Sequence, residues 1–250
     1  MTFETLRERY VIYGNITAKT PLHVGKGRGE KALGEADLPV LRLPDDRLYI
    51  PGSTLKGCLR SEAERILTGF GINVCIYTQL KGISPDYECE SEKSCAGCDI
   101  FGSTKMASRI IVRDAISEEK VSHSRLGIAI RRDTKTVDPA KGPFEIEFVA
   151  PGTTFRMEIV VENPEKWMLG LIFSAFELIP AIGGQVSRGM GKVEIKVTKV
   201  EKWTAESIVK QEPAETYKDE ERTVFIEECK KTFQRNIDRL KEKYGRLEKA

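Results

Sequence analysis

The sequence predicts an α+β protein built on an antiparallel sheet, and two patterns carry this prediction. Several short stretches alternate apolar and polar side chains, as strands with one buried face do. Two other stretches repeat apolar residues every three or four positions, as helices packed on a sheet do. In chain order these stretches form strand, helix, strand, strand, strand, helix and strand. This order contains the βαββαβ arrangement of a ferredoxin-like fold, the scaffold that RNA-recognition modules also use.

Each predicted element has a local basis in the sequence. Ser53 is expected to cap the first helix, whose apolar residues recur at helical spacing up to Gly69. Two alternating stretches flank Pro151-Gly152, which predicts a hairpin. The predicted strands cover 11–19, 109–115, 144–149, 155–161 and 192–200, and the predicted helices cover 53–69 and 166–179.

Composition and charge limit the classes of protein that the chain can represent. Of its 250 residues, 40% are hydrophobic and 31% are charged, which suits a folded core rather than a disordered chain. The net charge of +2 requires that any surface for phosphates be local. No apolar run of about 18 residues is present, so no membrane span is expected. The charged start of the chain lacks the apolar core of a signal peptide, and a cytoplasmic protein is expected.

The chain is expected to divide at residue 200. Residues 1–200 would form the ferredoxin-like domain with long insertions at 20–48, 73–102 and 120–143. Residues 201–250 would form a charged extension with an amphipathic helix. The apolar face of that helix could pack on its own domain or on a neighbouring subunit. It carries Ile226, Cys229, Phe233, Ile237, Leu240, Tyr244 and Leu247.

Four cysteines, Cys75, Cys89, Cys95 and Cys98, lie within 24 residues of each other. A reducing compartment argues against disulfide bonds there. Four thiolates suit a tetrahedral Zn²⁺ ion, and the tight Cys95–Cys98 pair can face one ion. A redox pair is the alternative, but the two further cysteines favour a structural zinc site.

Three loops combine basic or hydroxyl side chains with a setting that suits phosphates. Glycine-rich turns expose backbone N–H groups, and neighbouring cations add charge for nucleic acid. Such turns are common, and a basic loop is most often plain solvated surface. A fourth candidate is the start of the first helix, where one side of the helix would face a phosphate. The predicted RNA-binding residues are His23, Lys26, Arg28, Ser53, Lys56, Arg60, Arg131, Arg132, Lys135, Ser187 and Arg188.

Together these stretches resemble the RAMP superfamily of CRISPR-associated proteins, over roughly residues 8–200. Four segments carry the resemblance, and the second and fourth are highly specific in combination. They are Pro21–Gly27, Ile50–Arg60, Gly127–Thr134 and Gly183–Lys192. Within the superfamily the chain is most similar to the repeated backbone subunit of type III effector complexes.

The resemblance implies an RNA-guided ribonucleoprotein that gives antiviral defence. The fold would be a ferredoxin-like palm with a projecting thumb near 122–142. The partners would be CRISPR RNA, target RNA, further copies of the chain in a filament and other type III subunits. The target RNA would be cut with the help of Mg²⁺ or another divalent cation.

Asp37 occupies the place of the catalytic acidic residue in that subfamily, with Glu35 as a nearby alternative. A carboxylate there can hold a metal ion or accept the proton of a 2′-hydroxyl. Asp37 could instead only shape its Asp-Leu-Pro turn. Two other functions stay open: a guide-binding subunit that does not cut, and a stand-alone zinc-containing endoribonuclease. The second is less favoured because processing relatives use a histidine, and this chain has only His23 and His123.

Overall fold

The computed structural model describes residues 5–25, 36–75, 89–90, 94–138 and 142–245. Its main sheet is antiparallel, with strand order β2-β4-β7-β1-β8-β9, and β3 pairs with β7 beside β4. A separate two-stranded sheet joins β5 and β6. The strands are β1 (Glu8–Ala18), β2 (Tyr49–Ile50), β3 (Ile110–Val112), β4 (Ala115–Ile116), β5 (His123–Ile128), β6 (Pro143–Phe148), β7 (Thr154–Glu162), β8 (Val193–Thr204) and β9 (Glu215–Lys218).

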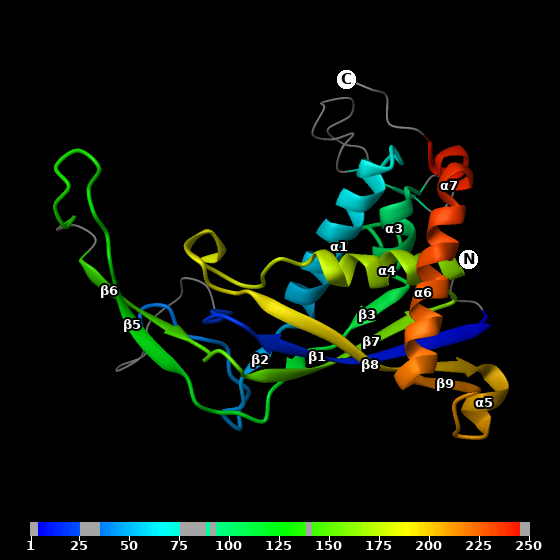
Figure 1. Cartoon of the computed structure of the whole chain (residues 1–250), viewed down its shortest axis with the longest axis horizontal. Helices are drawn as coiled ribbons and strands as arrows, with labels where there is room; N and C mark the ends of the chain where they lie inside the picture. Colours follow the sequence, from blue (N-terminus) through cyan, green and yellow to red (C-terminus); the bar gives the residue numbers. More distant parts are fainter. Residues whose placement is uncertain (1–4, 26–35, 76–88, 91–93, 139–141, 246–250) are drawn as a thin grey trace.

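The principal helices cover one face of the main sheet, and the β5–β6 hairpin projects away from the body (Figure 1). Helix α6 lies along α4, and α7 continues toward α1 and α3 at the top of the view. The helices are α1 (Gly52–Gly69), α3 (Ala96–Phe101), α4 (Lys166–Leu178), α5 (Ala205–Val209), α6 (Asp219–Arg235) and α7 (Ile237–Tyr244), with a 3₁₀ turn, η1 (Val186–Arg188). The α+β class with antiparallel sheets is confirmed.

The core lies between this sheet and its helices. Ile12 and Ile16 of β1 are fully buried, and α1 adds Leu59 and Leu67 from its apolar face. The predictions for β1, α1, α4, β7 and β8 were correct to within a few residues because each element has a clear local period. Among the described residues, no helix has the length and apolar character needed to cross a bilayer.

The predicted hairpin across Pro151-Gly152 was wrong. Strand β6 pairs with β5, from His123 opposite Phe148 to Ile128 opposite Pro143. Strand β7 already has β1 along one edge and β3 with β4 along the other. The turn therefore passes the chain from the projecting hairpin into the main sheet, and it does not fold the two strands together.

The prediction that Ser53 caps the first helix was also wrong. The helix begins at Gly52 with Pro51 at the cap position, and no side chain of the cap residue binds the helix end. The Gly52 N–H donates to the Asp114 carboxylate at 2.7 Å instead. A Cβ at residue 52 would lie 2.1 Å from the Val112 carbonyl oxygen, so only glycine allows this contact.

The amphipathic helix predicted in the charged extension is divided into two helices, α6 and α7, with Asn236 between them, and the extension also contains α5 and β9. Its buried side chains join the same core as the sheet. They are Phe225, Cys229, Phe233, Leu240 and Tyr244. In this structure, the apolar face of the extension packs on its own domain.

Helices α4 and α6 are in close contact at Gly170. A Cβ at that residue would lie 2.1 Å from the Cys229 carbonyl oxygen. Gly170→Ala should force the helices apart and cost about 1–3 kcal/mol, as overpacking does. For a chain of this size, each kcal/mol lowers the melting midpoint by about 2–4 °C in thermal unfolding.

Gly57→Ala is the matched control for this substitution. Gly57 also lies inside a helix, α1, but a Cβ there would meet nothing within 4 Å. Alanine should hold or raise the midpoint there because it forms helix better than glycine. Equal midpoints for the two variants would contradict the close packing of α4 on α6.

Candidate functional site

Asp37 lies on the edge of the projecting hairpin. Residues 37 and 38 run beside β6 on the side opposite β5, with Leu38 bridged in parallel to Ile146. The Leu38 N–H donates to the Glu145 carbonyl at 3.0 Å. The Glu145 N–H in turn donates to the Asp37 carboxylate at 2.7 Å. The hydrogen bond to β6 therefore holds the exposed Asp37 carboxylate at a fixed place on the hairpin. The Asp-Leu-Pro turn alone does not determine the position of this carboxylate.

Glu147 joins the Asp37 segment to the base of the hairpin. One carboxylate oxygen accepts from the Val40 N–H at 2.8 Å, and the other accepts from Arg42 at 2.8 Å and from the Ser122 hydroxyl. Burial alone would raise the pKa of this carboxyl, but the hydrogen bonds from Ser122, Arg42 and Val40 lower it below its ordinary value of 4.5. Glu147 is thus a charged anchor at neutral pH.

His23 is buried at the same junction. Its Nδ1–H donates to the Glu147 carbonyl at 2.7 Å, and its own carbonyl accepts from the Gly184 N–H at 2.7 Å. A Cβ at Gly25 would lie 2.6 Å from Nε2 of the imidazole. His23 therefore ties together the two glycine-rich loops and β6. Its predicted contact with RNA stays a prediction.

A cleft of about 640 Å³ lies between the hairpin and the second glycine-rich loop. The structure brings Arg132 and Arg188, both predicted to bind RNA, to this one cleft. The other lining residues are Arg125, Leu126, Gly127, Ile128, Ala129, Ile130, Phe144, Ile146 and Gln185. Arg125 and Phe144 belong to no motif that the sequence offers, and they were not predicted.

The arginines of the cleft have no carboxylate partner among the described residues. Arg188 donates to the Gln185 side-chain oxygen at 2.9 Å, and Arg125 donates to the Met190 sulfur at 3.1 Å. By contrast, Arg131 at the hairpin tip pairs with Asp133 at 2.6 Å. The cleft therefore offers uncompensated positive charge, and Arg131 offers much less.

The other predicted RNA-binding residues lie in several places. Lys135 and Ser187 are exposed, and Ser53 is exposed in the first turn of α1. Lys26 and Arg28, like the alternative carboxylate Glu35, lie outside the described residues. The structure thus places Arg132 and Arg188 of the predicted RNA-binding residues at the cleft and Ser53 at the start of α1.

Lys56 and Arg60 point toward the cysteine segment. Lys56 donates to the Ser108 hydroxyl at 2.9 Å, and burial, followed by the charge of Arg60, lowers the pKa of its amine. Arg60 donates to Glu64 at 2.7 Å and to the Cys98 sulfur at 3.3 Å. Burial works against the charged form of Arg60, but the bond to Glu64 outweighs it and raises the guanidinium pKa. Both side chains use donors within the protein, and their predicted phosphate contacts remain untested.

The four clustered cysteines converge on one point. Their Sγ atoms all lie within 4.8 Å of one another, and three of the residues are buried while Cys75 is half-buried. The Cys98 N–H donates to the Cys95 sulfur at 3.3 Å at the start of α3. Hydrogen bonds from the Cys75 and Cys98 thiols lower the pKa of the Cys95 thiol. This donor set can hold a soft metal ion such as Zn²⁺, which four sulfurs in a tetrahedron suit.

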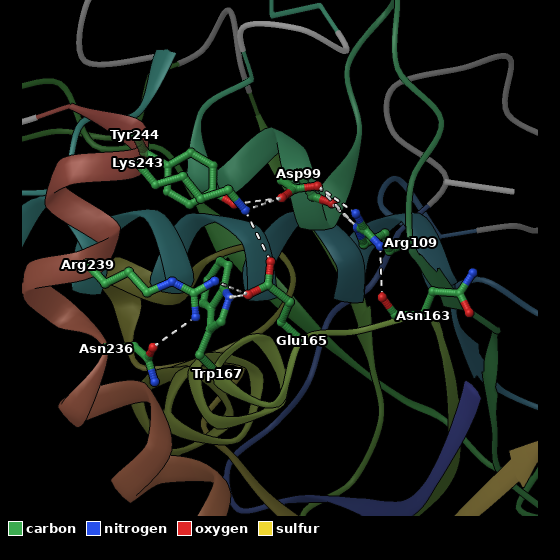
Figure 2. A network of polar contacts seen from close by, with 9 residues as sticks. All are labelled: Asp99, Arg109, Asn163, Glu165, Trp167, Asn236, Arg239, Lys243 and Tyr244. Atoms are coloured by element: carbon green, nitrogen blue, oxygen red, sulfur yellow. Dashed lines mark hydrogen bonds and ion pairs between the residues drawn. The ribbon is translucent and has the colours of Figure 1, made fainter. Parts of the chain in front are cut away.

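The end of the chain is bonded to this cysteine segment. Figure 2 shows Asp99, next to Cys98, between Arg109 on one side and Tyr244 of α7 on the other. The Tyr244 hydroxyl donates to Asp99 at 2.6 Å, and Arg109 contacts the same carboxylate at 3.1 Å. Lys243 bridges to Glu165 before α4 at 3.1 Å. The cysteine segment, α4 and α7 therefore share one polar network.

Fold and site together define an α+β protein of antiparallel sheets with a projecting hairpin, a cationic cleft along that hairpin and a cysteine cluster at the start of α3. The sequence model of the RAMP superfamily matches residues 15–194, and the chain belongs to this superfamily. The resemblance seen in the motifs is thereby confirmed.

Curated relatives agree with this assignment. The CRISPR system Cms endoribonuclease Csm3 of Methanothermobacter thermautotrophicus is 28% identical over an alignment of 247 positions, gaps included. The alignment covers 86% of this chain and 91% of that protein. The protein of the same name from Methanocaldococcus jannaschii is 28% identical over 78% of this chain and 82% of its own length. Csm3 of Enterococcus italicus is 27% identical over 76% of this chain and 91% of its own length.

Tyr244→Phe should weaken the attachment of α7 to the cysteine segment. The substitution removes one hydrogen bond to a carboxylate that is mostly buried, a loss of about 1–3 kcal/mol. Thermal unfolding should show a lower midpoint, and hydrogen exchange should accelerate in 237–244. Tyr49→Phe, which removes a hydroxyl with no described hydrogen bond, is the control, and equal effects of the two would contradict the anchoring role.

Proposed function

We propose that the chain is the guide-binding backbone subunit of a type III CRISPR complex, and that it cuts the target RNA paired with the guide. The single observation that carries this proposal is the cleft along the projecting hairpin, whose arginines have no carboxylate partner among the described residues. Asp37 is bonded to the same strand β6, at Glu145 between the cleft residues Phe144 and Ile146. The names of its relatives, which describe endoribonucleases of a CRISPR system, support the same activity.

The chemistry of the cleft suits RNA. Uncompensated guanidinium groups attract phosphates and match their geometry. Apolar and aromatic side chains in the same cleft, such as Ile130 and Phe144, can contact unstacked bases. The hairpin is the thumb in this proposal, and its exposed apolar residues interrupt base stacking. Those residues include Leu126 at 74% exposure and Ile128 at 57%.

Asp37 is the proposed catalytic residue. Its carboxylate accepts the proton of a 2′-hydroxyl, whose oxygen attacks the adjacent phosphorus. The bond from phosphorus to the 5′-oxygen then breaks, and this oxygen takes a proton from water, leaving a 2′,3′-cyclic phosphate and a 5′-hydroxyl. Hydrogen bonding to β6 and the anchoring of its segment by Glu147 keep this carboxylate in one position.

The prediction of Mg²⁺ or another divalent cation for RNA cutting stays a prediction. In the described part of the chain, the cysteines form the one group of three or more candidate metal ligands. Asp37 therefore offers one carboxylate, which does not make a magnesium site by itself.

For the cysteine cluster we propose one structural Zn²⁺ ion bound by Cys75, Cys89, Cys95 and Cys98. Support comes from the convergence of the four sulfur atoms and from the N–H and guanidinium groups that donate to them. Such an ion, when bound, contributes folding energy to a segment that has few apolar residues. Four thiolates leave no open position for catalysis.

The proposal includes a ferredoxin-like palm formed by β1, α1, β3, β7, α4 and β8. Its support is the spatial order β3-β7-β1-β8 with both helices on one face (Figure 1). Residues 1–200 form this unit with its insertions, together with the last residues of β8, which ends at Thr204, and the rest of 201–250 extends it. In the complex, further copies of the chain and other subunits assemble along the guide RNA.

Asp37→Asn should abolish cutting of target RNA and leave guide binding intact. The amide keeps the size of the side chain and an oxygen for the Glu145 N–H, but it does not accept a proton as a base. The measurement is cleavage of labelled target RNA by the assembled complex, with guide content determined in parallel. Glu145→Gln, which changes a carboxylate on the neighbouring strand, is the control and should cut.

Three outcomes of that experiment would change the proposal. Cutting at the normal rate by Asp37→Asn would remove Asp37 from the mechanism. If the purified unchanged protein carried no guide RNA of one uniform length, a stand-alone RNA-binding protein would be the better function. A complex that binds guide and target without any cutting would be the non-catalytic subunit.

Cys95→Ser should remove the zinc ion and destabilise the chain. Metal analysis of the unchanged protein is expected to find about one zinc per chain, held by four thiolates. The variant should contain much less, and a chelator should then lower its melting midpoint little further. Cys58→Ser, at a half-buried cysteine of α1 outside the cluster, should keep its zinc. Zinc far below one per chain in the unchanged protein would refute the site.

A further inference from the structure

Arg60 connects helix α1 to the cysteine segment through all three nitrogen atoms of its guanidinium group. Nε donates to the Glu64 carboxylate at 2.7 Å, and Nη1 donates to the Gly102 carbonyl at 3.1 Å. Nη2 donates to the Cys98 sulfur at 3.3 Å. Because the guanidinium group is planar and rigid, these three acceptors fix both its position and its orientation.

Two of the three acceptors belong to the segment that carries the cysteines. Cys98 lies within α3, and Gly102 is the residue that ends this helix. Gly102 has a φ of 80°, and a Cβ there would lie 2.9 Å from the Met106 carbonyl oxygen, so the chain turns sharply at the atom that Arg60 holds. Arg60 therefore fixes α3 relative to α1 at a cysteine ligand and at the end of the helix.

The cysteine cluster also has an electrostatic need that Arg60 meets. Four thiolates bring more negative charge than one Zn²⁺ ion offsets. The Glu64 carboxylate adds to this charge, because it is buried against α3, where a Cβ at Gly97 would lie 3.2 Å from its Oε1 atom. Charges interact more strongly in such a place than in water. Among the described residues, Arg60 is the one charged side chain that donates to a sulfur atom of the cluster.

We propose that Arg60 is a positioning residue of the metal site, which compensates the charge of the thiolates and holds Cys98 in the orientation that binds Zn²⁺. The inference rests on the proposed zinc site and adds a determinant of its affinity that lies in α1, outside the cysteine segment. A hydrogen bond from a charged donor is stronger than one from a neutral donor. Zinc binding and the packing of α1 on α3 are therefore coupled.

The test measures how tightly the full chain retains zinc in competition with a chromophoric chelator. Arg60→Met removes the charge and the donors but keeps a long side chain. Zinc should be held about tenfold more weakly, the lower end of the range for groups that orient metal ligands. Arg60→Lys, which keeps the charge without the planar fork, should lose less.

Arg65→Met is the matched control. Arg65 lies on the same helix and pairs with Glu62 at 2.8 Å, but it has no described hydrogen bond to a sulfur atom. Its replacement removes an ion pair of the same kind from α1 and should leave zinc retention unchanged. Equal losses in Arg65→Met and Arg60→Met would assign the effect to the stability of α1 alone.

Glu64→Gln separates charge compensation from packing. The amide keeps the size of the side chain and an oxygen for Nε of Arg60, but it removes a negative charge beside the thiolates. Zinc retention should therefore be unchanged or tighter, and adding Arg60→Met to this variant should still weaken it. A role in packing alone predicts weaker retention for Glu64→Gln as well.

Cobalt(II) in place of zinc gives a readout that packing does not move. A hydrogen bond to a thiolate stabilises the sulfur electrons, so Arg60→Met should shift the charge-transfer band from sulfur to cobalt to lower energy. Arg65→Met should leave this band in place.

Three outcomes would separate the inference from the site on which it rests. Normal zinc retention and an unshifted cobalt band in Arg60→Met would overturn the role of Arg60, while the zinc site would stand. Retention lost equally in Glu64→Gln and in the Arg60 variants would reduce the pair to packing, and Arg60→Lys decides this if Arg60→Met does not fold. Absence of zinc from the unchanged protein would overturn the zinc site itself.

Discussion

The candidate site of this molecule depends on one backbone pairing, between residues 37–38 and strand β6. The two segments are more than a hundred residues apart in the chain, yet hydrogen bonds of 3.0 Å in both directions join them. Since β6 also pairs with β5, the projecting hairpin acquires a third extended segment along its edge. Asp37, the cleft and the buried His23 all take their positions from this arrangement.

Charge strengthens that pairing where the backbone bonds end. Glu147 receives a backbone N–H and two side-chain donors, and these interactions favour its ionised form. The anchor is therefore negative at neutral pH, beside Arg42, which compensates it at 2.8 Å. The cleft lies on the same hairpin but has no such compensation among its described arginines, and this difference separates a structural ion pair from a binding surface.

The parts of the fold that sequence patterns predicted are those decided by local periodicity. Strand β1 and helices α1 and α4 have a repeat that a short window reveals. The predicted partner of β6 was wrong because the alternation of apolar and polar residues indicates a strand but does not indicate which neighbouring strand it pairs with. The cap of α1 was wrong for a similar reason, since the distant Asp114 supplies the acceptor that Ser53 was expected to supply.

The residues of the candidate site also fall into those that sequence patterns predicted and those that they did not. The cysteine cluster was predictable from the kind and spacing of its ligands, and the motifs singled out Asp37 and Arg188. No motif marks Arg125, Phe144 or Glu147, because their place in the site follows from the hairpin pairing alone. Arg60 matched a motif, yet its donors turn toward Glu64 and Cys98.

The attachment of the chain end to the cysteine segment also has a consequence for biosynthesis. The Asn73 N–H donates to the Gly245 carbonyl at 3.1 Å, at the entrance of the segment that contains the cysteines, and Tyr244 reaches Asp99 at its exit. The four cysteines precede α7 by more than a hundred residues in the chain, so they leave the ribosome well before their segment can receive these two contacts. A chain interrupted before residue 237 would carry the four thiols without the hydrogen bonds that join their segment to 244 and 245.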